Sequence, residues 1–432
     1  MNEYFTFQNL LSDETLFQGI NLLPAGHVLT IDRDRKKTIR RFWDPVFRPN
    51  QKRLYKDAVE ELRTHFEHAT TRHLIGDVPV GSQLSGGMDS ASLVAVATKS
   101  IPHFMTFTGG FDLELAEGFE LNFDERQDAE RVSRHVKSEH YSMLIQAGDM
   151  ERILPKLIWH LEDLRLGNSY PNYYICQLAS KFVKVALSGA GGDELFAGYP
   201  WRYEQVHDMH TSKDFDEKYF AYWQRLVPDG QKADFFQPHV WQQSDVALPF
   251  EKYRAVISPV DGLDPINKCL YFELKTFLHG LLVVEDKVSS AHGLEIRVPF
   301  LDTQLVEFAL SLPSEWKIRN GVGKAILREA LQPYLPADIL QKKKQGFAAP
   351  ERTWFRKSSF EYTRDLLLSP SSLNKEYIQS TYVERILREH MTGKTNHRLL
   401  IWSLLSFEWW LRIFLHDGFQ DAIKAPYYRT AR

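Results

Sequence analysis

The stretch "LSGGMDS" at positions 84–90 combines residue types that bind anions. Its paired glycines let the backbone approach an anion closely, and a helix that begins here offers unpaired N–H groups at its positive end. Ser85 and Ser90 add hydroxyl donors, whereas Asp89 would repel phosphate unless a cation lay between them. An aspartate inside a phosphate loop therefore indicates Mg²⁺ that joins the carboxylate to phosphate oxygens. The alternative is an ordinary glycine-rich turn.

Two better-known loops are excluded by the same stretch. The Walker pattern Gly-x-x-x-x-Gly-Lys-Ser/Thr is absent, and a hydrolase elbow would need glycine where Gln83 stands.

A second stretch, "VALSGAGGDELFAGY" at 185–199, repeats this design. An apolar strand leads into a Ser-Gly turn, and the acidic pair Asp193 and Glu194 follows. Two such turns at strand ends of one sheet can face each other across a cleft. Asp89 and Asp193 would then share Mg²⁺ on one polyphosphate. The alternative is a tight turn whose acidic side chains are solvated.

Two further stretches carry charged residues for which the sequence leaves both a structural and a catalytic role open. In residues 285–302, Lys287, Glu295 and Arg297 alternate with apolar residues in a pattern that neither a surface helix nor a strand explains well. Lys287 could neutralise phosphate, while Arg297 could equally form a structural pair with Glu295. The run "KKKQGFAAP" at 342–350 is either a solvated face or a source of mobile positive charge for a transition state.

Alternating strand-like and helix-like segments surround the first two loops. A long helix is expected over 54–74, because its apolar residues keep helical spacing. Strands are then expected at 78–84, 101–111, 140–145 and 182–187, and helices at 90–99, 124–137 and 149–161. This alternation predicts a doubly wound, mostly parallel α/β domain, whose ligands bind at the carboxyl ends of strands.

The chain is accordingly divided into three predicted parts. Residues 1–50 form a leading segment, 51–200 the α/β core and 201–432 a mainly helical remainder, in which 397–419 is the strongest helix.

Composition indicates a soluble cytoplasmic protein. The 432 residues carry a formal net charge of −3, which disfavours a nucleic-acid-coating or membrane-surface protein. Only two cysteines occur, Cys176 and Cys269, as expected in a reducing compartment. The N-terminus has no signal-peptide pattern, and no uninterrupted apolar run approaches the length of a membrane span.

From about residue 50 onwards, the chain resembles the synthetase half of the glutamine-dependent asparagine synthetases. The matching blocks, in the family's order, are residues 85–90, 187–199, 295–302, 324–331 ("KAILREAL") and Lys344 before Gln-Gly-Phe. The resemblance implies a fold of the ATP-pyrophosphatase type (PP-loop, adenine nucleotide α-hydrolase-like). It also implies an activity: ATP is cleaved between its α and β phosphates, a carboxylate such as that of aspartate becomes an acyl-adenylate, and ammonia converts it to an amide.

The resemblance further implies roles for individual residues. It assigns nucleotide binding to Leu84, Ser85, Gly86, Gly87, Asp89, Ser90, Gly109, Ser188 and Gly189, Mg²⁺ to Asp89 and Asp193, and catalysis to Lys287, Lys344 and Glu194.

Three departures limit these expectations. The family's N-terminal glutaminase, with its nucleophilic cysteine after Met1, is not seen here, since position 2 is Asn and residues 3–45 look like the connecting segment. Nitrogen would then come as free ammonia, from a separate glutaminase subunit, or as another amine. Ala190 replaces a family glutamate, and residues 162–164 read Glu-Asp-Leu instead of Asp-Glu-Pro beside the expected acceptor pocket.

Several functions therefore stay open at this point. The leading hypothesis is an asparagine synthetase-like ligase that uses ammonia; the alternatives are a lactam- or macrolactam-forming or specialised-metabolite amide synthetase, and a nucleotide-binding scaffold for a glutaminase. A homodimer is compatible with all three. A tRNA-modifying pyrophosphatase is disfavoured, because no RNA-binding module is evident.

Overall fold

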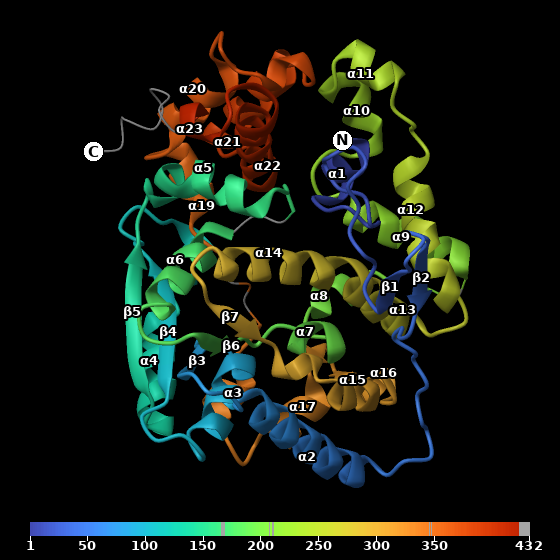
Figure 1. Ribbon diagram of the computed structural model, residues 1–432, viewed down its shortest axis with the longest axis vertical. Coiled ribbons are helices and arrows are strands. Elements are labelled where there is room, and N and C mark those ends of the chain that lie inside the picture. The colour runs from blue at the N-terminus through green and yellow to red at the C-terminus, as the bar shows by residue number, and fades with distance from the viewer. Residues whose placement is uncertain (166–168, 207, 210, 345, 347, 423–432) are drawn as a thin grey trace.

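A five-stranded parallel sheet organises the first half of the chain in the computed structural model, which describes residues 1–165, 169–206, 208–209, 211–344, 346 and 348–422 (Figure 1). The strands are β3 (Val80–Gln83), β4 (Met105–Phe111), β5 (Glu139–Ile145), β6 (Val185–Leu187) and β7 (Glu295–Arg297). Their spatial order is β5-β4-β3-β6-β7, and every neighbouring pair is parallel.

Helices cover both faces of this sheet. On one side α3 (Met88–Ala97) packs with α4 (Arg126–Val136), and on the other α6 (Ser169–Ala179) packs with α14 (His279–Ser290) (Figure 1). Side chains that alternate along β6 reach two separate hydrophobic cores: Val185 and Leu187 enter one, Ala186 the other. The predicted doubly wound α/β class is confirmed.

The strand order creates a switch point between β3 and β6. From β3 the chain builds β4 and β5 outward on one side, then returns to place β6 and β7 on the other. In the shared register Ser82 lies opposite Leu187, so the carboxyl ends of the two strands are neighbours. Ligands of open α/β sheets bind at such a point.

The fifth strand corrects one sequence expectation. Residues 295–297 form edge strand β7, in which Glu295 pairs with Val185 and Arg297 with Leu187. The mixed polarity that fitted neither a helix nor a strand is explained by this edge position, where part of each side chain stays exposed. The predicted boundary near residue 200, between the α/β core and the helical remainder, stays a prediction. Strand β7 lies beyond this boundary in the sequence but belongs to the sheet of the core.

The other predicted elements form close to the expected positions. The helix expected over 54–74 is α2 (Tyr55–His73), and the helix expected at 149–161 is α5 (Asp149–Leu161). The leading segment contains α1 (Asn2–Phe7), all of whose residues are buried, and an antiparallel hairpin of β1 (His27–Ile31) and β2 (Lys37–Arg41).

Short helices make up most of the remainder. They are α7 (Gly192–Leu195), α8 (Pro200–Tyr203), α9 (Ser212–Trp223), α10 (Lys232–Phe235), α11 (Pro238–Gln242), α12 (Leu248–Ile257), α13 (Pro265–Phe272), α15 (Thr303–Leu310), α16 (Ser314–Lys317), α17 (Ala325–Ala330), α18 (Ala337–Gln341), α19 (Glu351–Arg356), α20 (Phe360–Leu368), α21 (Ser380–Met391), α22 (Arg398–Trp410) and α23 (Phe419–Ala422). A hairpin of two short antiparallel strands, β8 (Ile318–Arg319) and β9 (Val322–Gly323), precedes α17. Single 3₁₀ turns occupy Gly118–Asn122, Asp229–Gln231, Ser258–Val260, Pro299–Leu301 and Asn374–Glu376, and π-helical turns occupy Glu273–Leu278 and Leu411–His416.

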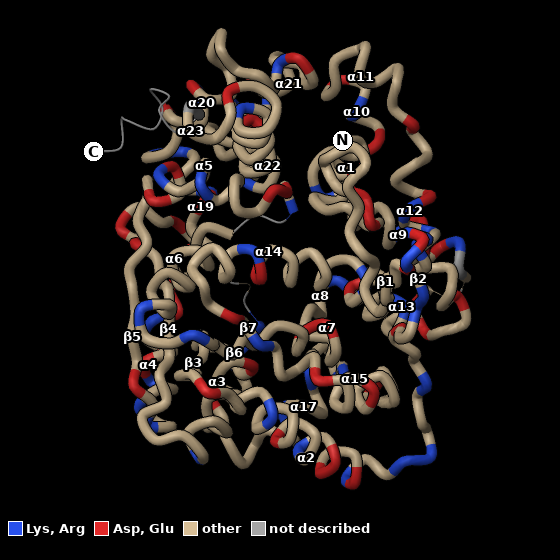
Figure 2. Tube along the Cα trace, viewed as in Figure 1, with Lys and Arg blue, Asp and Glu red and all other residues tan. Residues whose placement is uncertain are grey.

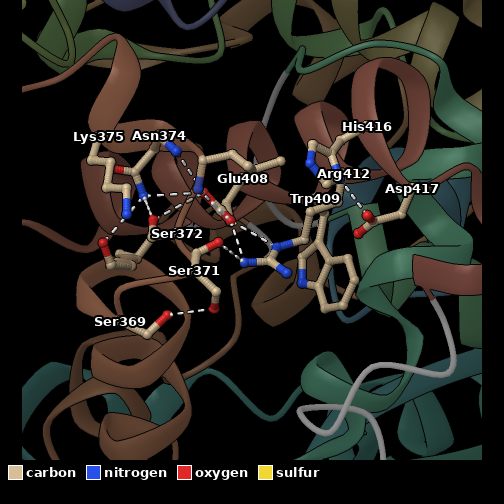
Figure 3. Close-up of polar contacts among 12 residues, drawn as sticks. Ser369, Ser371, Ser372, Asn374, Lys375, Glu408, Trp409, Arg412, His416 and Asp417 are labelled. Atoms are coloured by element: carbon tan, nitrogen blue, oxygen red, sulfur yellow. Dashed lines mark hydrogen bonds and ion pairs between the residues drawn. The ribbon is translucent and has the colours of Figure 1, made fainter.

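The C-terminal helices are joined by a buried polar network (Figure 3). Glu408 of α22 is fully buried and accepts hydrogen bonds from the backbone N–H groups of Leu373 and Asn374 at 3.0 and 2.8 Å. Arg412 donates to the same carboxylate at 2.7 Å. The segment Arg398–His416 is long and apolar enough to cross a membrane by composition, but 78% of its apolar window is buried inside the protein, as expected of a core helix.

Charges of both signs are interspersed along the surface helices, for example on α2 (Figure 2). This mixture agrees with the small net charge of −3.

Candidate active site

The two glycine-rich loops follow adjacent strands, as the sequence predicted. After β3, the backbone N–H of Ser85 donates to Ser90 Oγ at 2.9 Å, and the two hydroxyl oxygens lie 3.0 Å apart. The N–H of Gly87 donates to Ser85 Oγ at 3.2 Å. These bonds fold residues 85–90 onto the first turn of α3, where Asp89 is located.

A lysine that the sequence analysis had not singled out joins the two loops. Lys324 Nζ lies 2.5 Å from Asp89 Oδ2 and 2.6 Å from Asp193 Oδ1, and its side chain is only 3% exposed. On the other side, Lys344 Nζ lies 2.6 Å from Asp193 Oδ2. The structure therefore brings Asp89, Asp193 and Lys344 together, with Lys324 at their centre.

Neighbouring charges favour the ionised forms of Asp193 and Lys344. Burial raises the pKa of Asp193, but Lys324 and Lys344 outweigh it and hold that pKa well below its usual value. Burial lowers the pKa of Lys344, yet Asp193 and Asp89 raise it above its usual value. Asp193 and Lys344 thus form an ion pair at the end of the sheet.

Glycines allow the loops to approach so closely. A Cβ on Gly192 would lie 2.8 Å from Asp89 Oδ1, and a Cβ on Gly198 would lie 2.7 Å from Asp193 Cα and collide with its carboxylate. Larger residues at either position would push the two aspartates apart.

Glu194 follows Asp193 and is 2% exposed. Tyr199 donates its hydroxyl to Glu194 Oε1 at 2.8 Å. Burial, and then the neighbouring charge of Asp193, raise the pKa of Glu194 to about 7.

A cavity of about 250 Å³ opens between the ends of β3, β4 and β6. Predicted nucleotide residues lie in its wall together with Glu194: Leu84, Ser85, Asp89, Ser90, Gly109, Ser188 and Gly189. A Cβ on Gly109 would come within 2.8 Å of Ile175 Cγ1, so glycine keeps this end of the cavity open. Ala190 is also in the wall, which places the family departure inside the site.

A second cavity, of about 420 Å³, adjoins the first and is lined by basic side chains. Both share Ser85, Asp89, Glu125 and Lys344. The basic residues in the wall of the second cavity are Lys324, Arg328, Lys342, Lys343 and Lys344. The two volumes suit a nucleoside on the sheet side and a polyphosphate on the basic side.

The segment after α18 covers the first loop. Lys342 Nζ lies 2.7 Å from Asp128 Oδ2 and 3.5 Å from Glu125 Oε1, and a Cβ on Gly86 would come within 2.8 Å of the same ammonium. The absence of a side chain at Gly86 thus leaves room for Lys342 to lie over the loop. Positions 345 and 347 of the predicted lysine segment lie outside the described residues.

The structure does not bring Lys287 into the site. Its ammonium pairs with Glu162, and Lys287 is not among the described residues that line either cavity. Its catalytic role stays a prediction. The sequence analysis placed residues 162–164 beside the expected acceptor pocket, and residues 166–168 shortly after them lie outside the described part of the chain.

Arg297 and Glu295 form an ion pair, which the sequence analysis gave as one possible role of Arg297. Arg297 Nε donates to Glu295 at 2.7 Å, and its Nη1 donates to the carbonyl of His73 at 2.9 Å, at the end of α2.

Four site residues escaped the sequence analysis: Glu125, Glu285, Lys324 and Arg328. Lys324 and Arg328 both had a signal, as the first and fifth residues of the "KAILREAL" block, and Glu285 begins the charged stretch 285–302. Glu125 directly precedes α4, Glu285 belongs to α14 and Arg328 to α17, so their approach to one another depends on tertiary packing.

The aspartates meet the requirements of Mg²⁺. Oδ1 of Asp89 is buried and accepts no hydrogen bond from the described residues. Mg²⁺ commonly binds one or two protein carboxylates and completes its shell with water and substrate phosphates. No group of three or more His, Cys, Asp or Glu side chains suited to a metal occurs in the described ranges, so water and the phosphates of a substrate would supply the remaining ligands.

Comparison with known proteins identifies the family of this chain. The asparagine synthase family model matches residues 61–412. "Asparagine synthetase [glutamine-hydrolyzing] 1" of Bacillus subtilis is 30% identical over 95% of this chain and 68% of its own length. A "Putative asparagine synthetase [glutamine-hydrolyzing]" of Mycobacterium tuberculosis is 30% identical over 99% of this chain and 69% of its own.

Among solved structures, an NH3-dependent NAD synthetase from Campylobacter jejuni aligns with 52% of this chain and 93% of its own, at 14% identity and a TM-score of 0.22, which is too low to establish a shared fold. The family match covers most of the chain and includes both loops, Lys324 and Lys344. The chain belongs to the asparagine synthase family.

Proposed function

We propose that this chain is an ATP-dependent ligase that activates a carboxylate as an acyl-adenylate and then converts it to an amide with ammonia. The observation that supports this most strongly is the cluster in which Lys324 joins Asp89 and Asp193 across the ends of two neighbouring strands. Fixed charges of both signs at a glycine-rich loop suit the cleavage of a metal-bound polyphosphate.

In the first step, an oxygen of the carboxylate attacks the α phosphorus, and pyrophosphate leaves. Residues 85–90 would hold the leaving pyrophosphate, and Lys324 and Lys344 would neutralise the negative charge that develops on it. Mg²⁺ bound by Asp89 and Asp193 would add a divalent positive charge between the carboxylates and the phosphates.

In the second step, ammonia attacks the acyl carbon, and AMP leaves with the oxygen that came from the carboxylate. The backbone at Leu84 and Gly109 would bind the adenine, and Ser188 with Gly189 would bind the ribose or α phosphate. These residues already line one cavity.

Aspartate is the first carboxylate to test, because relatives carry the name asparagine synthetase. Ala190, which lines the cavity, favours testing other acids as well, including substrates whose own amine closes a lactam. Ammonia would come from solution or from a separate glutaminase.

Product analysis tests the proposal. The protein is incubated with ATP, Mg²⁺, ammonium and a panel of carboxylates that begins with aspartate. We expect AMP, pyrophosphate and amide in equal amounts. Formation of ADP and phosphate, or the absence of pyrophosphate with every acid, would contradict the proposal and favour a nucleotide-binding scaffold.

A further inference from the structure

Five carboxyl side chains line the 250 Å³ cavity: Asp89, Glu125, Asp193, Glu194 and Glu285. Each of the first four makes an ion pair or a hydrogen bond with another side chain. Asp89 and Asp193 bind Lys324. Glu125 lies 3.5 Å from the Lys342 ammonium, and Glu194 accepts the Tyr199 hydroxyl.

Glu285 lies elsewhere in the same cavity. It belongs to α14, which packs on the opposite face of the sheet from α3, and it is 8% exposed. Its interaction partner is the Ser188 hydroxyl, beside Gly189 and Ala190 in the cavity wall. No ion pair joins Glu285 to any residue in the described ranges, which leaves its carboxylate available to a ligand.

This location is close to where the acyl group must form. Under the proposed function, Ser188 and Gly189 bind the α phosphate or ribose, so the acyl carbon lies within reach of groups that contact Ser188. A nitrogen nucleophile that attacks this carbon must lose a proton, and the side chain of Ala190 has no group to accept it.

We infer that Glu285 is the proton acceptor for the nitrogen nucleophile in the amide-forming step. The inference rests on the proposed function. Ammonia forms the new C–N bond with its lone pair, and the acyl C–O bond to AMP breaks with its electron pair leaving on the phosphate oxygen. One proton of the attacking nitrogen passes to the Glu285 carboxylate and then to solvent, so amide, AMP and one proton are the products.

The protonation equilibrium of Glu285 suits this role. Burial raises its pKa to about 7, and the hydrogen bond with Ser188 moderates the rise. From α6, the Cys176 thiol faces it and stays protonated, because burial and Glu285 itself raise the thiol pKa. The other ionisable groups in the cavity wall are Asp89, Glu125, Asp193, Glu194, Tyr199 and Lys344.

Separation of the two half-reactions tests the inference. Glu285→Gln keeps the size of the side chain but removes the proton acceptor, and Asp286→Asn removes the exposed acid next to it as a matched control. Carboxylate-dependent exchange of labelled pyrophosphate into ATP reports the first step, and amide formation with ammonium reports the whole reaction.

We expect Glu285→Gln to keep exchange within a few-fold of the unchanged protein but to lose about 100-fold in amide formation. Hydroxylamine, whose nitrogen loses its proton to water more readily than that of ammonia once it has added to the acyl carbon, should restore much of the turnover as hydroxamate. Glu285→Asp should be intermediate, and Asp286→Asn unchanged.

Opposite results separate the two claims. Equal loss of exchange and amide formation in a folded Glu285→Gln variant would assign Glu285 to nucleotide binding and overturn the inference, as would unchanged amide formation. Absence of exchange in the unchanged protein with every carboxylate would contradict the proposed function, and the inference with it.

Discussion

At the scale of single residues, the charge balance of the site depends on Lys324. Its ammonium lies within 2.6 Å of two carboxylates that would otherwise repel each other, and burial leaves little water to screen them. Lys344 pairs with the other oxygen of the Asp193 carboxylate.

Replacement of Lys324 by Met should therefore abolish most of the ligase activity. We expect pyrophosphate formation to fall by about 100-fold or more, because charge on the leaving group is no longer neutralised. Lys213→Met, at a side chain that is 82% exposed, is the control and should retain full activity. Normal pyrophosphate formation by Lys324→Met would refute the role of this cluster.

A buried lysine outside the site gives a pH-dependent prediction. Burial lowers the pKa of Lys317 to about 7, and its Nζ makes no hydrogen bond to a described residue. Between that pH and the usual lysine pKa, the unfolded chain binds the extra proton, so this residue destabilises the fold at neutral pH and less so as the pH rises.

We therefore expect Lys317→Met to raise the melting temperature most at pH 7 and below, with a gain that shrinks toward pH 10. Thermal unfolding of both proteins across this range measures the difference. A gain that grew with pH would contradict the assignment of a neutral buried amine.

At the scale of elements, the two loops depend on glycines that leave room for the aspartates. Gly198→Ala should lower pyrophosphate formation by at least about 10-fold, because the new methyl group overlaps Asp193. Gly230→Ala is a matched control, since a Cβ there meets no atom within 4 Å. Comparable activity in the two variants would show that the loop spacing is not critical.

Sequence patterns predicted these elements well where the pattern is local. The loops at 84–90 and 185–199 follow buried strands, and their glycines and acids mark them directly. Strand β7 escaped prediction because an edge strand of three residues has too little alternation to be distinctive. Lys324 and Glu285 escaped because tertiary packing, which one sequence does not encode locally, brings them to the loops.

At the scale of the whole molecule, the helices after residue 350 support the sheet from a distance. Helix α22 packs on α5, and α5 packs on α14 and α6 behind the cavity. The buried Glu408 of α22 accepts hydrogen bonds from the backbone at Leu373 and Asn374 and so holds this turn in place, as Figure 3 shows. This arrangement predicts a structural role without direct chemistry.

Glu408→Gln should destabilise the fold by about 3 kcal/mol, because the buried ion pair between Glu408 and Arg412 would lose its negative charge. Below the unfolding temperature, the KM for ATP should be unchanged. Exposed Glu376→Gln is the control, and thermal unfolding with steady-state kinetics gives both measurements. A changed KM with unchanged stability would contradict a purely structural role.

The central claim is that a carboxylate oxygen of the substrate attacks the α phosphorus of ATP. Transfer of ¹⁸O tests it most directly, with a carboxylate labelled in both oxygens, ATP, Mg²⁺ and ammonium. Mass spectrometry of the products should find one ¹⁸O in AMP, one in the amide and none in pyrophosphate. Label in inorganic phosphate together with ADP, or AMP without label, would contradict the account.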